Sequence, residues 1–304
     1  MLDRAVCSAV GLAMDVLRPS FPPIIRVETT NGCNAKCVIC PHSSMERRIV
    51  NMKDDLFRRV VEEIHREGVD TIHLHNFGEP LLDRQLEERV ALCKSIGVRR
   101  VKMFSNGALL NERRARGLIE AGLDEIKVSI DGANREEFER IRFPLKYDAV
   151  VENVRGLVDL RNAMKSPMHI GIACATTSDK DQTMRDLEAY VDKFSFGRLH
   201  NWADWDSDAV AEAKVSRGIR KPCARVWRTF TILSNGKVAL CCLDYEGAVE
   251  LGDLNEPGTT IRSIWNGERY EEIRRLHRTG RQAEIANCAN CSKAYLRLGD
   301  SAAV

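Results

Sequence analysis

The alternation of β-rich runs and helical segments between residues 20 and 205 constrains the fold more than any other feature. Short apolar runs are followed there by amphipathic segments, six times in succession. This order predicts a parallel sheet with helices outside it. Six units are too few to close an eight-stranded barrel, so we expect an α/β fold with a partial, TIM-like (β/α)6 barrel. The expected strands are residues 24–30, 71–77, 101–107, 125–132, 168–177 and 197–205.

The expected helices between these strands include residues 54–68, 85–97, 111–122 and 183–194. After residue 205 the pattern changes to a hairpin, residues 228–242 around the Asn235-Gly236 turn, and a mostly helical segment, residues 261–280. The chain therefore divides into three parts. A helical segment occupies residues 1–20, the partial barrel residues 21–205, and a small α+β domain residues 206–304.

Composition excludes some broad classes of partner. The 304 residues are 44% hydrophobic and 30% charged, as in globular proteins with a core, and the net charge is +2. This small charge predicts neither nucleic acid nor an anionic membrane as a partner. The apolar stretch 5–14 is too short to span a bilayer and has no convincing cleavage site, so we expect an amphipathic helix and a cytoplasmic chain.

Cysteine is frequent, with eleven residues in the chain. In a reducing cytoplasm, metal binding or redox chemistry is the expected use, rather than disulfides. Cys7, Cys93 and Cys174 lie in helical or β-rich runs and are predicted to be buried apolar side chains. The other eight form two groups, which are Cys33, Cys37 and Cys40, and then Cys223, Cys241, Cys242, Cys288 and Cys291.

The first group has the spacing Cys-x3-Cys-x2-Cys in the loop after the first strand. A cubane [4Fe–4S] cluster has four irons, so three thiolates leave one iron open to a ligand. The alternative is a zinc site in which His42 supplies the fourth ligand.

These residues resemble the radical S-adenosylmethionine (SAM) superfamily over about residues 22–205. Besides the three cysteines, "NFGEP" (76–80) is similar to the Gly-Gly-Glu-Pro motif that contacts the SAM amino group, with Phe77 in place of the first glycine. "FSNG" (104–107) and "VSIDG" (128–132) stand where the family contacts the ribose and carboxylate of SAM. The resemblance implies SAM contacts at Ile39, Phe77, Gly78, Glu79, Ser105, Asn106, Ser129 and Asp131.

The resemblance also implies a mechanism. The open iron chelates SAM, one electron cleaves its sulfonium bond, and the 5′-deoxyadenosyl radical abstracts a hydrogen atom from an unactivated C–H bond. The protein positions and shields the reactants while the cofactor performs the chemistry. A flavodoxin or ferredoxin is the implied electron donor.

The second group flanks the hairpin. Cys223 and Cys241 fit the pattern Cys-x12-Gly-x4-Cys with Gly236 as the glycine, and Cys288-x2-Cys291 follows a helical segment. Together with "SIWNG" (263–267), these residues resemble the twitch form of the SPASM domain. That resemblance implies an auxiliary [4Fe–4S] cluster with four thiolate ligands and no open iron. A four-thiolate zinc ribbon is the alternative.

Cys242 directly follows a predicted ligand. If both residues lie on a strand, their side chains point to opposite faces and cannot easily bind one cluster. We therefore assign Cys241 as the ligand. Cys242 is then a spare buried thiol, an alternative ligand, or a catalytic hydrogen-atom donor to a substrate radical.

The leading expectation is oxidation of a hydroxyl-bearing carbon in a small polar substrate, such as a sugar or aminocyclitol, with the auxiliary cluster as electron acceptor. Twitch dehydrogenases that oxidise aminocyclitols provide the analogy. The step needs a general base, for which Arg198, His200 and Asp204 are candidates.

Three alternatives remain open. The first is redox-neutral epimerisation, with Cys242 as the hydrogen donor. The second is peptide maturation, which is less expected because twenty residues before the barrel are too few for a leader-binding domain. The third is a non-catalytic iron–sulfur or zinc scaffold, against which the open-site cysteine loop argues.

Overall fold

The computed structural model describes residues 2–175, 181–197, 199–203, 205, 207–208, 210 and 219–295. The chain forms two compact units. The barrel unit comprises residues 26–199 and 233–235, and the C-terminal unit comprises residues 1–25, 200–232 and 236–304.

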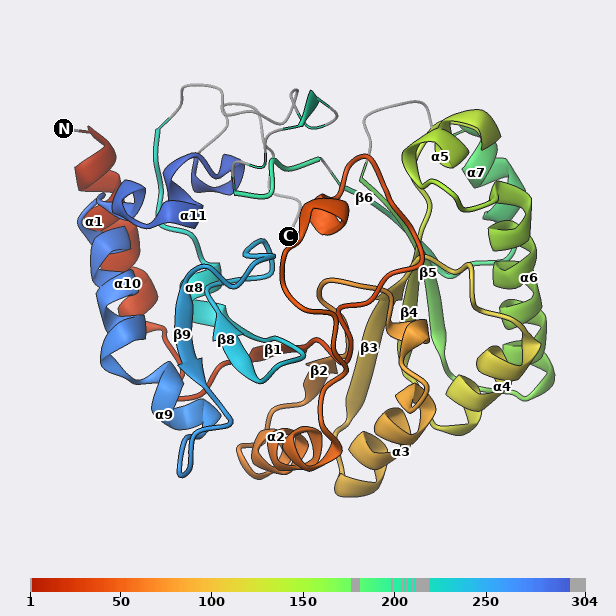
Figure 1. Cartoon of the computed structure of the whole chain (residues 1–304), viewed down its shortest axis with the longest axis horizontal. Coiled ribbons are helices and arrows are strands. Elements are labelled where there is room, and N and C mark those ends of the chain that lie inside the picture. The colour runs from red at the N-terminus through yellow and green to blue at the C-terminus, as the bar shows by residue number, and fades with distance from the viewer. Residues whose placement is uncertain are drawn as a thin grey trace. The chain divides into compact units, whose positions relative to one another are not determined.

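The barrel unit contains a sheet whose strands are neighbours in chain order, from β1 to β6. Strands β2 to β6 pair in parallel. The helices that connect the strands lie along one side of this sheet (Figure 1). The strands are β1 (Ile24–Val27), β2 (Thr71–His73), β3 (Arg100–Ser105), β4 (Glu125–Ser129), β5 (His169–Cys174) and β6 (Lys193–Phe196). The helices are α2 (Asp54–Arg66), α3 (Leu86–Ile96), α4 (Glu112–Glu120), α5 (Arg135–Ile141), α6 (Tyr147–Ala163) and α7 (Asp181–Leu187), with short 3-10 turns at η1 (Pro41–Ser44) and η2 (Pro80–Leu82).

The two faces of this sheet differ in chemistry. Successive side chains of a strand point to opposite faces, and the side chains toward the helices are fully buried and apolar. They include Ile72, Val101, Ile126 and Ile170, each with no exposed area. Most of the residues that alternate with them are polar and half-buried, such as His73, Lys102, Glu125 and Lys127, and Phe104 is exposed among them. Packing therefore uses one face and leaves the polar face for a ligand.

The partial barrel predicted from the sequence is confirmed, but the position of the sixth strand is wrong. The strand β6 is Lys193–Phe196 rather than residues 197–205. Helix α7 ends at Leu187, where the N–H groups of Tyr190 and Val191 both donate to the Leu187 carbonyl. The β-rich run that follows is then free to pair with β5.

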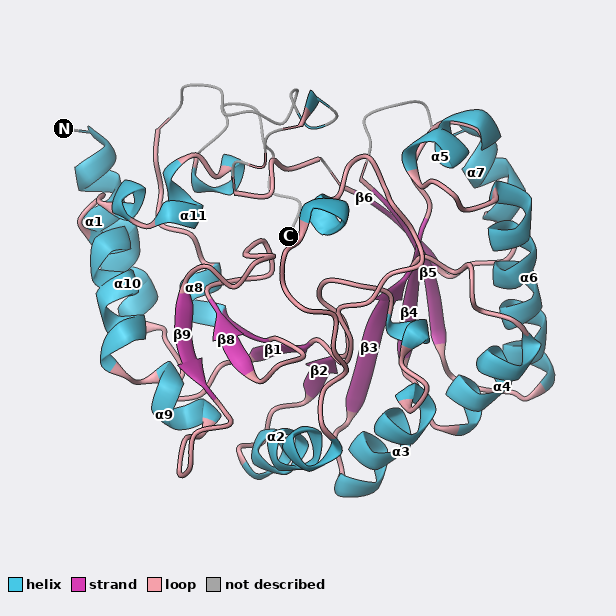
Figure 2. Ribbon diagram, in the orientation of Figure 1, coloured by secondary structure: helices cyan, strands magenta, loops and turns pink. Residues whose placement is uncertain are grey.

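The C-terminal unit contains an antiparallel sheet in the order β7-β8-β9. The predicted hairpin is confirmed as β7 (Thr229–Ile232) and β8 (Lys237–Ala239), but β9 (Glu250–Asp253) was not predicted. The helix expected at 261–280 is two helices, since Gly267 begins a new one (Figure 2). The helices are α1 (Leu2–Val16), α8 (Arg225–Arg228), α9 (Ile261–Trp265), α10 (Glu268–Arg278) and α11 (Ala286–Ala289), with 3-10 turns η4 (Gln282–Glu284) and η5 (Ser292–Ala294).

Helix α1 is part of this unit. Asp15 forms an ion pair with Arg278 of α10 and accepts a hydrogen bond of 2.6 Å from the indole of Trp227. A side chain at Gly11 would lie 2.7 Å from Cγ of Arg278, so the small residue permits this packing. Within the described residues, no helix is both long and apolar enough to cross a bilayer.

The burial of the three separate cysteines is as predicted. Cys7 and Cys93 have no exposed area and Cys174 is 4% exposed. These three side chains therefore belong to the cores of the units and not to the cysteine groups.

Candidate functional site

The three-cysteine loop follows β1 and returns to the same strand. The Met52 N–H donates to the Thr29 carbonyl at 2.8 Å, and the Val50 N–H donates to the Asn31 side chain at 2.8 Å. The Asn31 amide in turn donates to the Arg48 carbonyl at 3.0 Å. These bonds close the segment that carries Cys33, Cys37 and Cys40 into a ring anchored at the carboxyl end of β1.

The fully buried carboxylate of Glu28 binds both this loop and the segments next to it. It forms a two-bonded ion pair with Arg47 at 2.9 and 3.1 Å. It also accepts hydrogen bonds from the Phe77 N–H at 3.2 Å and the Asn76 amide at 3.3 Å. The N–H and hydroxyl of Ser234, in the same unit, donate at 3.1 and 2.9 Å. One carboxylate therefore connects the cysteine loop to the "NFGEP" segment.

A second buried carboxylate, Glu79, connects that segment to β3. It accepts hydrogen bonds from the Ser105 hydroxyl at 2.7 Å, the Asn106 N–H at 2.6 Å and the Leu81 N–H at 3.0 Å. Burial raises the pKa of this carboxyl, although these donors lower it. The Asn106 amide donates to Asn34 of the cysteine loop at 2.8 Å. The structure thus brings together Glu79, Ser105 and Asn106, which were predicted from separate motifs.

The backbone conformation at position 78 requires a glycine. Its φ is +88°, and a side chain there would lie 2.6 Å from the Gly32 carbonyl oxygen. The neighbouring Glu79 N–H donates to that same oxygen at 2.7 Å. The predicted SAM-contact segment therefore lies directly against the cysteine loop, which adds a second reason for glycine besides approach to a ligand.

Asp131 lies at the end of β4 and is fully buried. It forms an ion pair with Arg142, whose Nε donates at 2.8 Å, and its other oxygen accepts from the Ala175 N–H at 2.5 Å. Burial alone would lower the pKa of Arg142, but Asp131 and the nearby thiols of Cys37 and Cys40 raise it. Arg142 thus places a positive charge beside the cysteine loop, and no motif in the sequence had indicated it.

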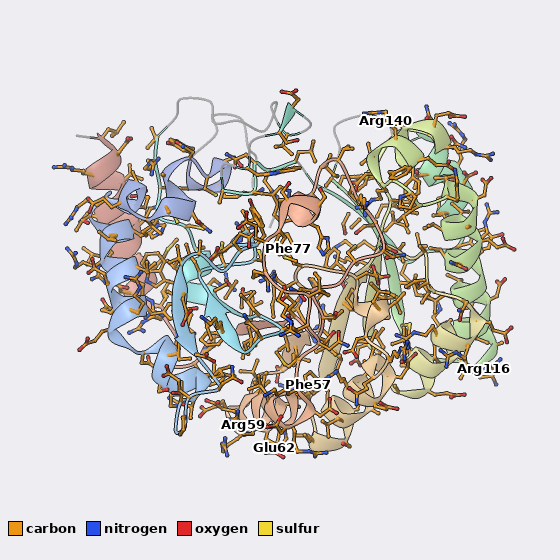
Figure 3. All side chains as sticks on the ribbon, viewed as in Figure 1. Phe57, Arg59, Glu62, Phe77, Arg116 and Arg140 are labelled. Atoms are coloured by element: carbon orange, nitrogen blue, oxygen red, sulfur yellow. The ribbon has the colours of Figure 1, made fainter. Side chains whose placement is uncertain are left out.

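The other predicted SAM contacts lie in the same unit. Ser129 ends β4 on the polar face, and Ile39 is half-buried within the cysteine loop. Figure 3 labels Phe77 among the side chains. This residue is 3% exposed. The loop is held from its other side, because the N–H groups of Lys36 and Val38 donate to the carbonyls of Phe143 at 2.6 Å and Ile141 at 2.9 Å.

The thiols of the loop are half-buried and largely withdrawn from water. Burial raises the pKa of Cys33 to about 11 and that of Cys40 to about 12, and it also raises the pKa of Cys37. Buried thiols of this kind become thiolates when a metal binds them. His42, the fourth ligand of the zinc alternative, places Nε2 2.7 Å from the Asn31 carbonyl oxygen. That nitrogen is therefore used within the loop.

The second cysteine group lies in the C-terminal unit. Cys223 precedes α8, Cys241 and Cys242 follow β8, and Cys288 and Cys291 lie in and after α11. Burial lowers the pKa of Arg225, but the thiols of Cys242, Cys223, Cys241 and Cys291 raise it above its ordinary value. One cation therefore faces cysteines from three separate segments. Within the described residues, no three Cys, His, Asp or Glu side chains converge as ligands of a single metal ion.

Asp244 shapes the turn that presents Cys241. Its fully buried carboxylate accepts from the N–H groups of Ala248 at 2.8 Å and Val249 at 3.1 Å, and from the Asn287 amide at 2.6 Å. The last bond ties this turn to the segment carrying Cys288. The Cys241 sulfur itself accepts a hydrogen bond of 3.4 Å from the Leu243 N–H.

Cys241 and Cys242 do not lie on a strand, because β8 ends at Ala239. The expected placement of Cys241 and Cys242 on opposite faces of a strand is therefore wrong, since side chains in a turn do not alternate between two faces. Both residues lie near Arg225. The glycine-to-cysteine spacing remains the reason to assign Cys241 as the ligand.

His277 of α10 links two of the predicted ligands. Its Nδ1 accepts a hydrogen bond of 3.3 Å from the Cys223 N–H, and its Nε2 lies 3.7 Å from the Cys288 sulfur. Burial and the charge of Arg220 lower the pKa of His277 to about 4. His277 was not predicted from the sequence, because a histidine within an amphipathic helix has no recognisable signal.

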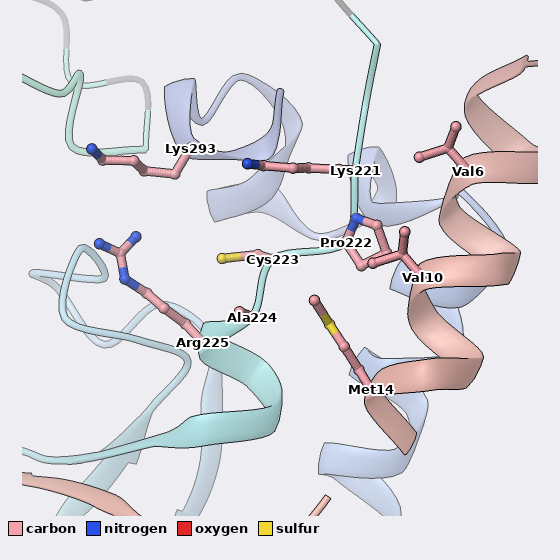
Figure 4. Close-up of a pocket in the computed structure, with 9 residues that line it drawn as sticks. All are labelled: Val6, Val10, Met14, Lys221, Pro222, Cys223, Ala224, Arg225 and Lys293. Carbon is pink, nitrogen blue, oxygen red and sulfur yellow. The ribbon is translucent and has the colours of Figure 1, made fainter. Parts of the chain in front are cut away.

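A pocket of about 340 Å³ opens beside Cys223. Val6, Val10 and Met14 of α1 form its apolar side (Figure 4). Lys221, Arg225 and Lys293 contribute cationic side chains, and the Cys223 sulfur lies among them (Figure 4). Positive charge therefore surrounds the place where several thiolates are expected.

The structure describes only one of the three residues that were predicted as candidate bases. Arg198 and Asp204 lie outside the described residues. His200 is in the C-terminal unit, where burial together with the charges of Lys293 and Arg225 lowers its pKa to about 3. His200 is therefore neutral near pH 7 but a weak proton acceptor.

The fold and the two cysteine groups define an α/β partial-barrel protein with iron–sulfur chemistry. The radical SAM superfamily model matches residues 27–187, which is more than half of the chain. The chain belongs to the radical SAM superfamily. An iron–sulfur cluster-binding domain, SPASM, matches residues 223–292. Membership implies SAM and [4Fe–4S] clusters as cofactors, and the two groups of free cysteines, one in each unit, are of the residue type that such clusters require.

Curated relatives match about half of this chain and about half of their own length. An uncharacterized protein of Methanocaldococcus jannaschii is 28% identical over 48% of the chain and 46% of its own length. A probable GTP 3′,8-cyclase of Saccharolobus islandicus is 34% identical over 45% and 44%, respectively.

Solved structures share the fold along most of the chain. BtrN in complex with AdoMet and 2-DOIA is 20% identical with a TM-score of 0.62, covering 88% of this chain and 92% of BtrN. Streptococcus suis SuiB bound to the precursor peptide SuiA is 13% identical with a TM-score of 0.66, covering 94% and 72%. The anSMEcpe structure with bound AdoMet is 16% identical with a TM-score of 0.60, covering 89% of each chain.

Replacing Glu28 by Gln tests whether its carboxylate anchors the cysteine loop. The change leaves the buried Arg47 without its charged partner, so we expect a loss of about 3 kcal/mol in the free energy of unfolding. Urea denaturation of the metal-free protein measures it. Glu250→Gln is the control, because that residue forms only an exposed pair with Lys237 and should change stability little. Equal losses in both variants would contradict the anchoring role.

Proposed function

We propose that this protein is a radical SAM oxidoreductase that oxidises an alcohol carbon of a small polar substrate, such as a sugar or aminocyclitol. The observation that carries the proposal is the unequal number of cysteines in the two groups. The barrel loop provides three thiols, and the second cysteine group provides four at the spacing of the SPASM family and one more.

In this proposal, Cys33, Cys37 and Cys40 hold the first cluster and leave one iron for SAM. When bound, the cluster and SAM together supply one-electron chemistry that removes a hydrogen atom from an unactivated C–H bond. The chain's own residues orient SAM. Glu79 is fully engaged by donors from β3 and η2, so its role is to fix the backbone of residues 77–79 as the surface that contacts the SAM amino group.

Asn106 and Ser129 are the proposed ribose and carboxylate contacts, together with Ser105 and Asp131. The Asp131 carboxylate already binds Arg142 and the Ala175 N–H, so it acts by positioning these groups. Ile39 packs against the adenine. Arg142 offsets the negative charge of the thiolates beside it.

Cys223, Cys241, Cys288 and Cys291 are the proposed ligands of the auxiliary cluster. Four thiolates leave no iron open for the substrate, which favours an electron-transfer role. In this oxidation the substrate carbon would lose a hydrogen atom, its hydroxyl would lose a proton to a base, and the auxiliary cluster would accept one electron, so that C–OH would become C=O. A flavodoxin or ferredoxin is the proposed donor to the first cluster.

The likeness to BtrN, whose solved structure is a complex with AdoMet and 2-DOIA, supports a small-molecule substrate. SuiB, whose complex contains a precursor peptide, has a similar fold and makes peptide maturation the second candidate. The third candidate is redox-neutral epimerisation with Cys242 as hydrogen donor, which its position near Arg225 and Cys241 permits.

The iron content of anaerobically reconstituted protein tests the ligand assignment. We expect about eight irons in the wild type, and about four both in a Cys33/Cys37/Cys40→Ala variant and in a Cys223/Cys241→Ala variant. Reduced wild-type protein with SAM should release 5′-deoxyadenosine, and the first variant should release none. Four irons with one zinc in the wild type would contradict the electron-acceptor role. No 5′-deoxyadenosine from the eight-iron protein would contradict the enzyme assignment.

Replacing Cys242 by Ala separates oxidation from epimerisation once a substrate has been found. Oxidation predicts unchanged product, because the electron leaves through the auxiliary cluster. Epimerisation predicts loss of product while 5′-deoxyadenosine is still formed, because the substrate radical is no longer quenched. Cys93→Ala is the matched control, since that thiol is buried in the barrel core. Product analysis by mass spectrometry in deuterated buffer distinguishes these results.

A further inference from the structure

The polar face of the barrel sheet carries charged and histidine side chains that are not among the proposed SAM contacts. Strand register places His73, Lys102, Glu125 and His169 in one row across β2 to β5. Lys127 lies in the next row, paired with Phe104 on one side and Gly171 on the other. His75 belongs to the same surface, because its ring lies 4.7 Å from that of Phe104.

This face is cationic. Lys102 and Lys127 both form ion pairs with Glu125, the second at 3.6 Å, so a single carboxylate is shared by two ammonium groups. Arg26 of β1 adds a third cation and forms no ion pair with any residue that the structure describes. Burial, together with Arg26, Lys102 and Lys127, lowers the pKa of His73 to about 4. Burial, His73, Arg26 and Lys127 lower that of His75.

Several polar atoms of this face lack partners. One terminal guanidinium nitrogen of Arg26 and the Nδ1 atoms of His73, His75 and His169 are buried without a hydrogen bond among the described residues. Leaving a buried polar atom unsatisfied costs about 1–3 kcal/mol, and native proteins keep few of them. Four on one surface, beside an excess of positive charge, indicate a surface arranged for an anionic ligand.

We propose that this face binds an anionic group of the substrate, a phosphate or a carboxylate, through Arg26 and Lys127. The inference rests on the proposed function and narrows its substrate class to acidic small molecules. Arg26 offers a planar pair of donors, which suits both groups. The Lys127 ammonium also lies 3.4 Å from the Ser195 hydroxyl, which holds it on this face.

The neighbours of Lys127 support that role. The lysine stem lies over Gly171, where an added Cβ would be in ordinary van der Waals contact, 3.5 Å, with Cγ of Lys127. The ammonium lies 5.6 Å from the centre of the Phe104 ring, which is 36% exposed. An apolar ring next to the cations can contact the carbon skeleton of a substrate while its acidic group binds Arg26.

The test measures binding of inorganic phosphate and of acetate to reconstituted protein by titration calorimetry, both without SAM and with saturating SAM. Arg26→Gln should weaken binding of the preferred anion at least tenfold, and Lys127→Gln should weaken it as well. Arg26→Lys should restore part of the affinity. The control is Arg113→Gln, on the exposed surface of α4, which should bind like the wild type.

The anion that binds more tightly, phosphate or acetate, identifies the kind of acidic group in the substrate. Equal binding by the wild type and Arg26→Gln overturns the proposal, as does binding that SAM abolishes, because the anion would then occupy the site of the SAM carboxylate. Release of 5′-deoxyadenosine, measured on the same samples, tests the proposed function separately from the anion site. Release without Arg26-dependent binding refutes the anion site alone, and binding without release refutes the proposed function alone.

An independent observation concerns His277. Its Nδ1 accepts from the Cys223 N–H, so the ring proton is on Nε2, which faces the Cys288 sulfur at 3.7 Å. We infer that His277 donates a hydrogen bond to a ligand sulfur of the auxiliary cluster and raises its reduction potential, which also rests on the ligand assignment above. Such bonds stabilise the more negative, reduced cluster.

An EPR-monitored redox titration of the Cys33/Cys37/Cys40→Ala protein, which retains only the auxiliary cluster, tests this positioning role. His277→Phe should shift the midpoint potential to lower values, and His277→Gln, which keeps a donor, should shift it less. Trp227→Phe is the control, because Trp227 packs against the same ring with centroids 6.0 Å apart. An unchanged potential in a His277 variant that retains four irons overturns the inference.

Discussion

The buried carboxylate of Glu28 is the interaction on which the barrel site depends. A loop that must present three thiols to one cluster cannot pack an apolar core of its own, so it needs fixed attachment points. Glu28 supplies one, because it holds Arg47 of the loop and the backbone of Phe77 at the same time. Glu79 extends the connection to β3. Burying a carboxylate without partners is costly, but here each has several donors, which makes the arrangement rigid.

The two faces of the barrel sheet have separate roles, one in stabilising the fold and the other in carrying charge. The apolar face stabilises the fold against the helices, and the polar face carries charges that contribute little to packing. Cations recur beside both cysteine groups, Arg142 in the barrel and Arg225 in the C-terminal unit. Clusters with thiolate ligands are negatively charged, so fixed positive charge stabilises them and influences their potentials.

The sequence predicts those features of the fold and the site that depend on short local patterns of residues. The strand–helix alternation gave the partial barrel, and the Cys-x3-Cys-x2-Cys spacing indicated the superfamily. Features that depend on distant contacts were missed. Glu28 has no motif, since its partners are remote in the chain, and Arg142 has none because it acts on the distant Cys37 and Cys40. The strand β9 is only Glu250–Asp253 and contains a glycine, so its β-signal is weak. The periodicity of residues 183–194 continued beyond the end of α7 and displaced the sixth strand.

The central claim is that one of two clusters has an open iron that binds SAM. EPR spectra of the reduced protein, recorded with and without SAM labelled with ¹⁵N at its amino group, test it most directly. The account predicts that SAM changes the signal of one cluster, with a ¹⁵N hyperfine coupling, and that this change is absent from the Cys33/Cys37/Cys40→Ala protein. SAM-insensitive spectra from the fully loaded protein, or a change that persists in that variant, would contradict it.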